Sequence, residues 1–274
     1  MTDRTVKERL ETLGLRQAYA YLDKDPQNNI PKLVDWLEKY DKSGMLKNQI
    51  RGVRMALADP NNNWNQLVKS LWTDIDPAVR KRIFENFVVN GSIIGGHRQQ
   101  AYRERENCNI PWAILMDPTS ACNLHCTGCW AAEYGDKLNL SLAQLDDIIR
   151  QGKEIGVYFY IYSGGEPLVR KADIINLCEA HPDCVFLSFT NGTLIDEAFA
   201  DEMLRVQNFI PAISVEGFEE ETDSRRGKGT YARLLKGMEI LRKKKLPFGV
   251  SCCYTSRNTE ATGSEAYFDQ VVAW

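Results

Sequence analysis

Three cysteines of this chain, Cys122, Cys126 and Cys129, are spaced C-x3-C-x2-C. They lie in the stretch 117–130, which follows a short apolar run and is therefore predicted to be a loop that leaves a strand. Three thiolates on so short a path can surround one compact inorganic centre. A cuboidal iron–sulfur cluster held this way would keep one iron without a cysteine ligand. A structural zinc site normally has a fourth Cys or His; His125 is the neighbouring candidate, so zinc is the alternative.

A second group of candidate residues follows later apolar runs. Gly164 and Gly165 would let the backbone approach a ligand closely, and Glu166 can accept hydrogen bonds from an ammonium group. The next two apolar runs carry or lead into further candidate residues, which are Ser188, Thr190, Asn191 and Gly192 for the first and Ser214, Glu216, Gly217, Arg225 and Arg226 for the second. Ser214 and Glu216 are predicted to share one face, because side chains alternate along a strand.

The elements that must position these residues alternate between strand and helix from residue 110 onward. The expected strands are continuous and apolar, as strands buried on both faces should be, and span residues 113–117, 158–163, 185–190, 209–215 and 248–254. The expected helices span residues 141–156, 171–180, 196–205, 231–244 and 264–274. Such units form parallel sheets and place functional loops at the carboxyl ends of the strands, so the candidate residues should meet at one rim.

Residues 3–105 have the apolar spacing of helices and lack the alternation of strands. The helices expected here span residues 3–25, 31–40, 45–58, 64–72 and 77–89, with Pro31 in the first turn of the second. Glycines at 91, 95 and 96 indicate a hinge. We therefore predict an α/β chain: an all-helical domain, residues 1–108, followed by a partial TIM-like (β/α) barrel of about five to six parallel strands, residues 109–274. The barrel pattern stops inside a helix, which favours a chain truncated at its C-terminus.

The composition excludes several classes of protein. A formal net charge of -3 in 274 residues gives no reason to expect nucleic-acid or membrane-surface binding. No transmembrane segment or leader is expected, so the prediction is a cytoplasmic protein. Eight cysteines in such a chain favour metal binding or buried thiols over disulfides. Cys178 and Cys184 are predicted to be structural, whereas Cys252 and Cys253 should lie in the fifth strand with their side chains on opposite faces.

The three-cysteine loop together with Gly-Gly-Glu-Pro resembles the radical S-adenosylmethionine (radical SAM) superfamily, in particular the branch of cofactor- and peptide-maturing enzymes with additional C-terminal clusters. The resemblance covers residues 110–274. It implies a [4Fe-4S] cluster and S-adenosylmethionine as cofactors, with the open iron chelated by the methionyl group. The metal ligands implied are Cys122, Cys126 and Cys129. The implied contacts to S-adenosylmethionine come from Gly164, Gly165, Glu166, Asn191, Ser214, Glu216, Arg225 and Trp130.

Two positions depart from the family's pattern. The family usually has an aromatic residue just before the third cysteine, where this chain has Gly128 and places Trp130 after it. The fourth strand usually ends with Asp, where this chain has the longer Glu216. The predicted contacts of Trp130 with the adenine and of Glu216 with the ribose or carboxylate region depend on these two positions.

The function implied by the resemblance is reductive cleavage of S-adenosylmethionine to a 5′-deoxyadenosyl radical, which abstracts hydrogen from an unidentified peptide, lipid or cofactor precursor. A flavodoxin or ferredoxin type of electron donor is the implied partner. Cys252 or Cys253 is a candidate hydrogen donor, the alternative being a small buried thiol. The alternative functions are iron–sulfur electron transfer or redox sensing without radical turnover, or an inactive binding module. Glu166 and its glycines favour the radical enzyme, because an electron carrier does not need an amine-binding loop.

Overall fold

A computed structural model describes residues 6–40 and 47–274 of the chain. The chain divides into two compact units, Met1–Lys81 and Arg82–Trp274. The domain boundary expected between residues 108 and 109 stays a prediction. Among the described residues, no helix is long and apolar enough to cross a membrane.

The described part of the first unit is helical, as predicted. Its helices are α1 (Val6–Lys24), α2 (Pro26–Tyr40), α3 (Lys47–Ala58), α4 (Asn63–Thr73) and α5 (Pro77–Ile83), the last of which continues into the second unit. Pro31 lies inside α2, so its expected place in the first turn was wrong. The helix begins earlier because the Asp25 carboxylate accepts the Asn28 N–H at 3.3 Å, which favours a start at Pro26. The ends of two expected helices, residues 3–5 and 45–46, lie outside the described residues.

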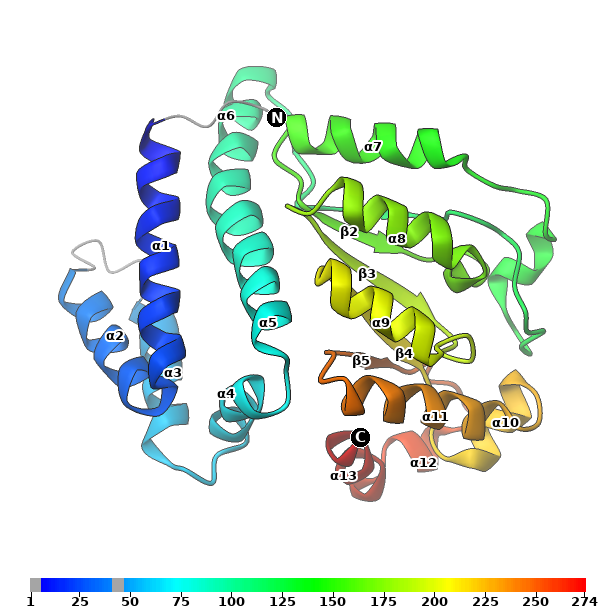
Figure 1. Cartoon of the computed structure of the whole chain (residues 1–274). Coiled ribbons are helices and arrows are strands. Elements are labelled where there is room, and N and C mark those ends of the chain that lie inside the picture. The colour runs from blue at the N-terminus through cyan, green and yellow to red at the C-terminus, as the bar shows by residue number, and fades with distance from the viewer. Residues whose placement is uncertain (1–5, 41–46) are drawn as a thin grey trace. The chain divides into compact units, whose positions relative to one another are not determined.

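The second unit is built on five parallel strands in the order β1-β2-β3-β4-β5, which confirms the predicted partial barrel. The strands are β1 (Ala113–Met116), β2 (Phe159–Tyr162), β3 (Val185–Thr190), β4 (Phe209–Ser214) and β5 (Gly249–Ser251). The crossovers contain α7 (Leu142–Glu154), α8 (Lys171–Ala180), α9 (Glu197–Val206) and α11 (Thr230–Lys243), and Figure 1 shows these helices on one side of the sheet. The capping box expected at the start of α7 is present between Ser141 and Gln144.

The two faces of the sheet differ in burial. Tyr160, Tyr162 and Phe186 are fully buried toward the helices, and Phe186 stacks on both tyrosine rings. Because side chains alternate along a strand, Leu115 and Phe189 point to the opposite face, where they are 58% and 39% exposed. That inner face is therefore left open, which is the side on which a partial barrel can take up a ligand.

The expected hinge at Gly91–Gly96 was wrong, because these residues are helical. A π-helical segment, η1 (Phe84–Gly95), runs directly into α6 (Gly96–Glu106). Gly95 is needed for close packing instead: a Cβ there would lie 2.3 Å from the carbonyl oxygen of Gly156. Glycine at this position therefore serves contact with the barrel.

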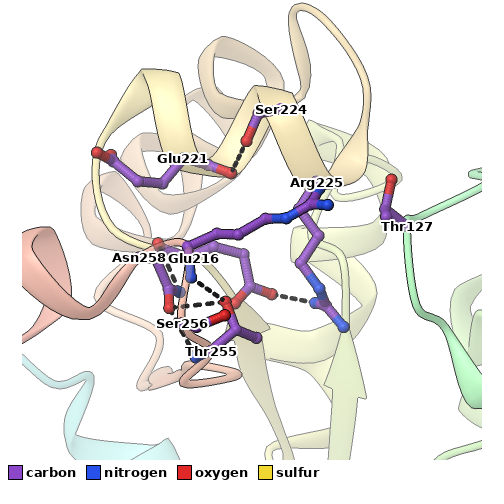
Figure 2. Close-up of a pocket in the computed structure, with 9 residues that line it drawn as sticks. Thr127, Glu216, Glu221, Ser224, Arg225, Thr255, Ser256 and Asn258 are labelled. Carbon is purple, nitrogen blue, oxygen red and sulfur yellow. Dashed lines mark hydrogen bonds and ion pairs between the residues drawn. The ribbon is translucent and has the colours of Figure 1, made fainter.

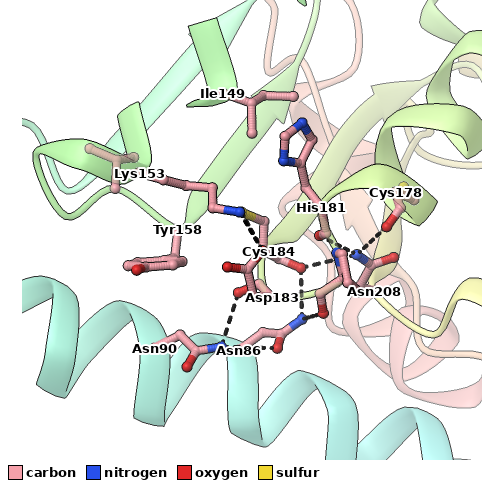
Figure 3. A network of polar contacts seen from close by, with 12 residues as sticks. Asn86, Asn90, Ile149, Lys153, Tyr158, Cys178, His181, Asp183, Cys184 and Asn208 are labelled. Carbon is pink, nitrogen blue, oxygen red and sulfur yellow. Dashed lines mark hydrogen bonds and ion pairs between the residues drawn. The ribbon is translucent and has the colours of Figure 1, made fainter. Parts of the chain in front are cut away.

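Two asparagines of η1 hold the turn that leads into β3 (Figure 3). Asn86 Nδ2 donates to the carbonyls of Pro182 and Cys184 at 2.9 and 2.8 Å, and Asn90 Nδ2 donates to the Asp183 carbonyl at 3.0 Å. These bonds satisfy carbonyl groups at the entrance of the sheet. The η1 segment is thus an integral part of the second unit.

The remaining elements lie after the strands. They are the 3₁₀ turns η2 (Trp130–Tyr134) and η3 (Pro167–Arg170) and the helices α10 (Glu219–Arg226), α12 (Thr259–Thr262) and α13 (Glu265–Ala273). Helix α10 was not among the expected helices, although acidic residues in its first turn and Arg225 and Arg226 in its last turn complement a helix dipole. The fifth strand is shorter than predicted and ends at Ser251.

Candidate functional site

The cysteine loop and the glycine loop run side by side beyond the ends of β1 and β2. The main-chain N–H of Gly165 donates to the Thr119 carbonyl at 2.9 Å, and that of Glu166 donates to the Ala121 carbonyl at 2.8 Å. A Cβ on Gly165 would lie 2.2 Å from the Ala121 oxygen. Gly164 has φ +103°, which glycine adopts without strain. The two glycines therefore allow the glycine loop to pack directly against the start of the cysteine loop.

Glu166 is 1% exposed and joins the ends of β2 and β3. Its carboxylate accepts hydrogen bonds from the Leu168 N–H at 2.9 Å, the Thr190 hydroxyl at 2.7 Å and the Asn191 N–H at 2.7 Å. Burial raises the pKa of Glu166, while these three donors act in the opposite direction. The structure gives this carboxylate partners within the protein, and its contact with a methionyl amine stays a prediction.

The cysteine loop is held at its centre by Asn123. The side chain of Asn123 donates to the Thr193 hydroxyl at 2.9 Å and accepts from Asn191 Nδ2 at 2.8 Å. Further along, the Thr127 N–H donates to the Arg225 carbonyl at 2.8 Å. Asn123 and Thr127 were not among the predicted site residues, because only the fold reveals that their partners lie on other strands' loops.

The three thiols of this loop are free, with Cys122 exposed and Cys126 and Cys129 half-buried. The Leu124 N–H donates to Cys122 Sγ at 3.4 Å. Burial raises the pKa of the Cys122 and Cys126 thiols, and at Cys126 the guanidinium of Arg226 opposes that effect. Nearby N–H donors and cationic groups favour the thiolate, which is the form that binds iron.

The donor set fits a cluster better than a single ion. In the part of the chain that the structure describes, no three His, Cys, Asp or Glu side chains are grouped to hold one metal ion. The thiolates of a cuboidal cluster each bind a different iron, so they need to be spaced more widely than ligands of one zinc ion. Cys122, Cys126 and Cys129 are three free thiols on one loop, the ligand number that a cuboidal cluster with one open iron takes.

The end of β4 carries a cluster of charged side chains, of which Figure 2 shows Glu216 and Arg225. Glu216 is fully buried and forms ion pairs with Arg225 and Arg226, while Ser214 is half-buried at the end of the strand. Beside the cluster lies a hollow of about 180 Å³, lined by Thr127, Glu216, Glu221, Ser224, Arg225, Thr255, Ser256, Arg257 and Asn258. Glu216 and Arg225 are thus brought beside the cysteine loop as expected of one rim, and their contacts with S-adenosylmethionine stay predictions.

A larger hollow of about 740 Å³ lies along β1 and the start of the cysteine loop. Its lining includes Trp130 and Tyr134, whose rings meet edge to face at 5.8 Å, and both glycines of the glycine loop. Trp130 is 57% exposed, so its ring is available to a ligand. Trp130, Tyr134 and the two glycines line the same space, although the sequence places the aromatic residues at least thirty positions before the glycines.

Four of the other cysteines fall into a buried pair and an exposed pair. Cys178 and Cys184 are fully buried, which confirms that they are structural, and burial raises the pKa of the Cys178 thiol. Cys252 and Cys253 were wrongly placed in the fifth strand: both follow β5 and both are exposed. The cause is that Glu216 and Asn258 bind the main chain of Cys253, which removes it from the strand pairing.

Known proteins resemble this chain in sequence. An AdoMet-dependent heme synthase of Methanosarcina barkeri is 32% identical over 159 residues, which are 56% of this chain and 45% of that protein. A cysteine-type anaerobic sulfatase-maturating enzyme of Clostridium perfringens is 26% identical over 167 residues, or 53% of this chain and 45% of the enzyme. The chain spans about half the length of these curated relatives.

Solved structures show the same fold. Streptococcus suis SuiB bound to its precursor peptide SuiA aligns with a TM-score of 0.54 and 21% identity, covering 65% of this chain and 40% of that one. The structure titled native anSMEcpe with bound AdoMet aligns with a TM-score of 0.50 and 24% identity, covering 58% and 48% of the two chains.

The family model described as the radical SAM superfamily matches residues 116–257, more than half of the chain. The match begins at the last residue of β1 and includes the cysteine loop, the glycine loop and the charged end of β4. Membership implies a [4Fe-4S] cluster and S-adenosylmethionine as cofactors, as the resemblance had predicted. The cysteine spacing and the parallel sheet agree with this match, and the chain therefore belongs to the radical SAM superfamily.

Proposed function

We propose that this chain is the barrel of an enzyme that cleaves S-adenosylmethionine reductively and uses the resulting radical on a further substrate. The observation that carries the proposal is the pair of hydrogen bonds that fix the glycine loop against the start of the three-cysteine loop. When bound, a reduced cluster of this kind supplies the electron that cleaves S-adenosylmethionine to methionine and a 5′-deoxyadenosyl radical.

The chain's own residues bind and orient the cofactors. Cys122, Cys126 and Cys129 would hold the cluster. For the methionyl amine, the proposed acceptors are the main-chain carbonyls of Gly164 and Gly165, since the Glu166 carboxylate is buried and already accepts three hydrogen bonds. The ammonium group would therefore be bound by the loop that Glu166 holds in place.

We propose the remaining contacts with S-adenosylmethionine from the positions of five further side chains. Ser214 at the end of β4 offers a hydroxyl group, and Asn191 lies between the Glu166 and Asn123 contacts. Arg225 and Glu216 belong to the charged cluster beside the cysteine loop. Trp130 presents an exposed ring for the adenine.

The substrate would enter from the open inner face of the sheet, beside the hollow that Trp130 and Tyr134 line. Leu115 and Phe189 give that face an exposed apolar surface, and a substrate bound against it would displace water from the site of the radical reaction. The heme synthase and the sulfatase-maturating enzyme among the relatives keep both cofactor precursors and peptides as candidate substrates. An electron donor of the flavodoxin or ferredoxin type is the proposed partner.

The test is anaerobic reconstitution of the full-length protein with iron and sulfide, followed by dithionite and S-adenosylmethionine. We expect 5′-deoxyadenosine and methionine in equal amounts, measured by liquid chromatography. A correctly loaded, reducible protein that forms no 5′-deoxyadenosine would instead support the alternative of electron transfer or redox sensing without radical turnover. The Cys126→Ala variant, treated identically, is the control for cluster-independent cleavage.

A further inference from the structure

Every polar group of Glu216 is bonded within the protein. One carboxylate oxygen, Oε1, accepts from Arg225 Nη1 at 2.5 Å and from Arg226 Nε and Nη2 at 2.9 and 2.5 Å. The other, Oε2, accepts the Cys253 N–H at 3.0 Å. Its own N–H donates to the Thr222 hydroxyl at 3.1 Å, and its carbonyl accepts from Asn258 at 3.1 Å. Glu216 therefore joins the end of β4 to both α10 and the segment after β5 (Figure 2).

This connection extends to the cysteine loop through Arg225. The guanidinium of Arg225 is bound by Glu216, and the carbonyl of the same residue accepts the Thr127 N–H at 2.8 Å. Thr127 lies between Cys126 and Cys129. A displacement of the last turn of α10 would thus be transmitted to two of the three thiols.

The charges of Glu216, Arg225 and Arg226 affect the electrostatic potential at the cysteine loop. Arg225 and Arg226 carry two positive charges, and the buried carboxylate of Glu216 supplies one negative charge between them. Their side chains are 19% and 11% exposed, so water screens them only partly. Removing the carboxylate charge would leave two poorly solvated cations beside the cysteine loop.

We infer that Glu216 is a positioning residue for the cysteine loop, acting through Arg225 on Thr127, and that its charge offsets the two arginines next to the cluster. The effect of Glu216 on an iron–sulfur cluster rests on the proposed function, whereas its positioning of the cysteine loop is a property of the apoprotein. The residue acts through other groups and need not touch S-adenosylmethionine.

The first test is amide hydrogen exchange on the apoprotein. Glu216→Gln cannot satisfy both the arginine donors and the Cys253 N–H, because its amide nitrogen is not an acceptor. We expect exchange at Thr127 to become at least tenfold faster, while the amides of β3 keep their protection. Glu220→Gln is the matched control, since it removes the same charge from an exposed residue of α10, the helix that carries Arg225, and should leave exchange at Thr127 unchanged.

The second test is the midpoint potential of the reconstituted cluster, measured by electron paramagnetic resonance during a redox titration. Glu216→Gln should raise the potential, because a reduced cluster is stabilised by uncompensated positive charge. Glu216→Asp keeps the charge but shortens the side chain, so its potential should stay near wild type while exchange at Thr127 still increases. A purely structural role would move the potential of both variants alike.

Wild-type exchange at Thr127 together with a wild-type potential in Glu216→Gln would overturn the inference. If Glu216→Gln does not fold, Arg225→Lys takes its place, because it weakens the same ion pair and keeps the main-chain carbonyl. Wild-type exchange at Thr127 in Arg225→Lys would likewise overturn the inference. A wild-type protein that cleaves no S-adenosylmethionine would contradict the proposed function only, since the exchange experiment contains neither cluster nor substrate.

Discussion

Tyr160 and Tyr162 lie two residues apart on β2 and are both fully buried, but only Tyr160 has a hydrogen-bond partner for its hydroxyl group. Tyr160 Oη lies 2.9 Å from the Ile149 carbonyl oxygen and 3.0 Å from that of Val157. Among the described residues, Tyr162 Oη has no partner. The two hydroxyl groups therefore make opposite contributions to the stability of the sheet.

Replacing each tyrosine by phenylalanine separates these contributions. Tyr160→Phe should destabilise the apoprotein by about 1–2 kcal/mol, because it removes a buried hydrogen bond. Tyr162→Phe should be neutral or slightly stabilising, because it removes an unsatisfied polar group. Urea denaturation of both variants measures the difference, and equal losses would contradict it.

Gly165→Ala tests the contact between the two loops. The added Cβ would lie 2.2 Å from the Ala121 oxygen and 2.4 Å from the Ser120 oxygen, so the backbone must move. We expect a loss of about 1–3 kcal/mol and less iron bound after reconstitution. Gly249→Ala is the control, because a Cβ there meets no atom within 4 Å. Wild-type iron content in Gly165→Ala would show that the contact does not shape the cluster site.

The cysteines should separate by role when replaced by alanine. Cys126→Ala should prevent stable loading of the cluster, since it leaves two local thiolates. Cys178→Ala should keep the loading and cost about 1 kcal/mol of stability for the small cavity it creates. Iron and sulfide analysis after reconstitution decides the matter; equal loss of iron in both variants would refute the assignment of ligands.

His181 makes the stability of the apoprotein depend on pH. Burial lowers its pKa, and the hydrogen bond to Asp146 at 2.9 Å opposes that shift. The unfolded chain therefore binds a proton more readily, so stability should fall as pH drops below about 6.5. His181→Gln should show a smaller decrease in melting temperature between pH 7.5 and 5.5 than wild type. The same decrease in both proteins would exclude His181 as its source.

The asparagines of η1 lead to a prediction about fragments. Because Asn86 and Asn90 bind the turn before β3, a fragment of residues 82–274 should unfold cooperatively. A fragment of residues 109–274, cut at the boundary expected from the sequence, should expose the surface that η1 covers and bind a hydrophobic dye. Cooperative unfolding of the shorter fragment would favour the sequence-based boundary.

The sequence predicted the sheet well, because continuous apolar runs such as Val185–Thr190 report burial on both faces. It failed where a long-range contact decides the local structure. Cys253 belongs to an apolar run, but Glu216 and Asn258 bind its main chain and end the strand. Gly95 indicated a hinge in the sequence, but it lies in a helix, and its lack of a side chain allows the close approach to Gly156, a contact that only the fold reveals.

In the candidate site, too, local features were predictable from the sequence and long-range contacts were not. Spacing alone was enough to single out the cysteines, since their ligand chemistry is local. For Glu166 and Glu216, residue type and position indicated a ligand-binding role, whereas the structure surrounds both carboxylates with donors from the protein. Those donors come from residues whose proximity depends on the sheet, so no local pattern contains them.

The close approach of Gly165 to Ala121 also bears on inheritance. Selection against any larger residue at this position acts through folding, before any cofactor binds. A descendant that had lost radical chemistry would therefore retain its glycines for as long as it retained the barrel. In related chains, the glycine pair should record ancestry, whereas the cysteines should record whether the ancestral chemistry persists.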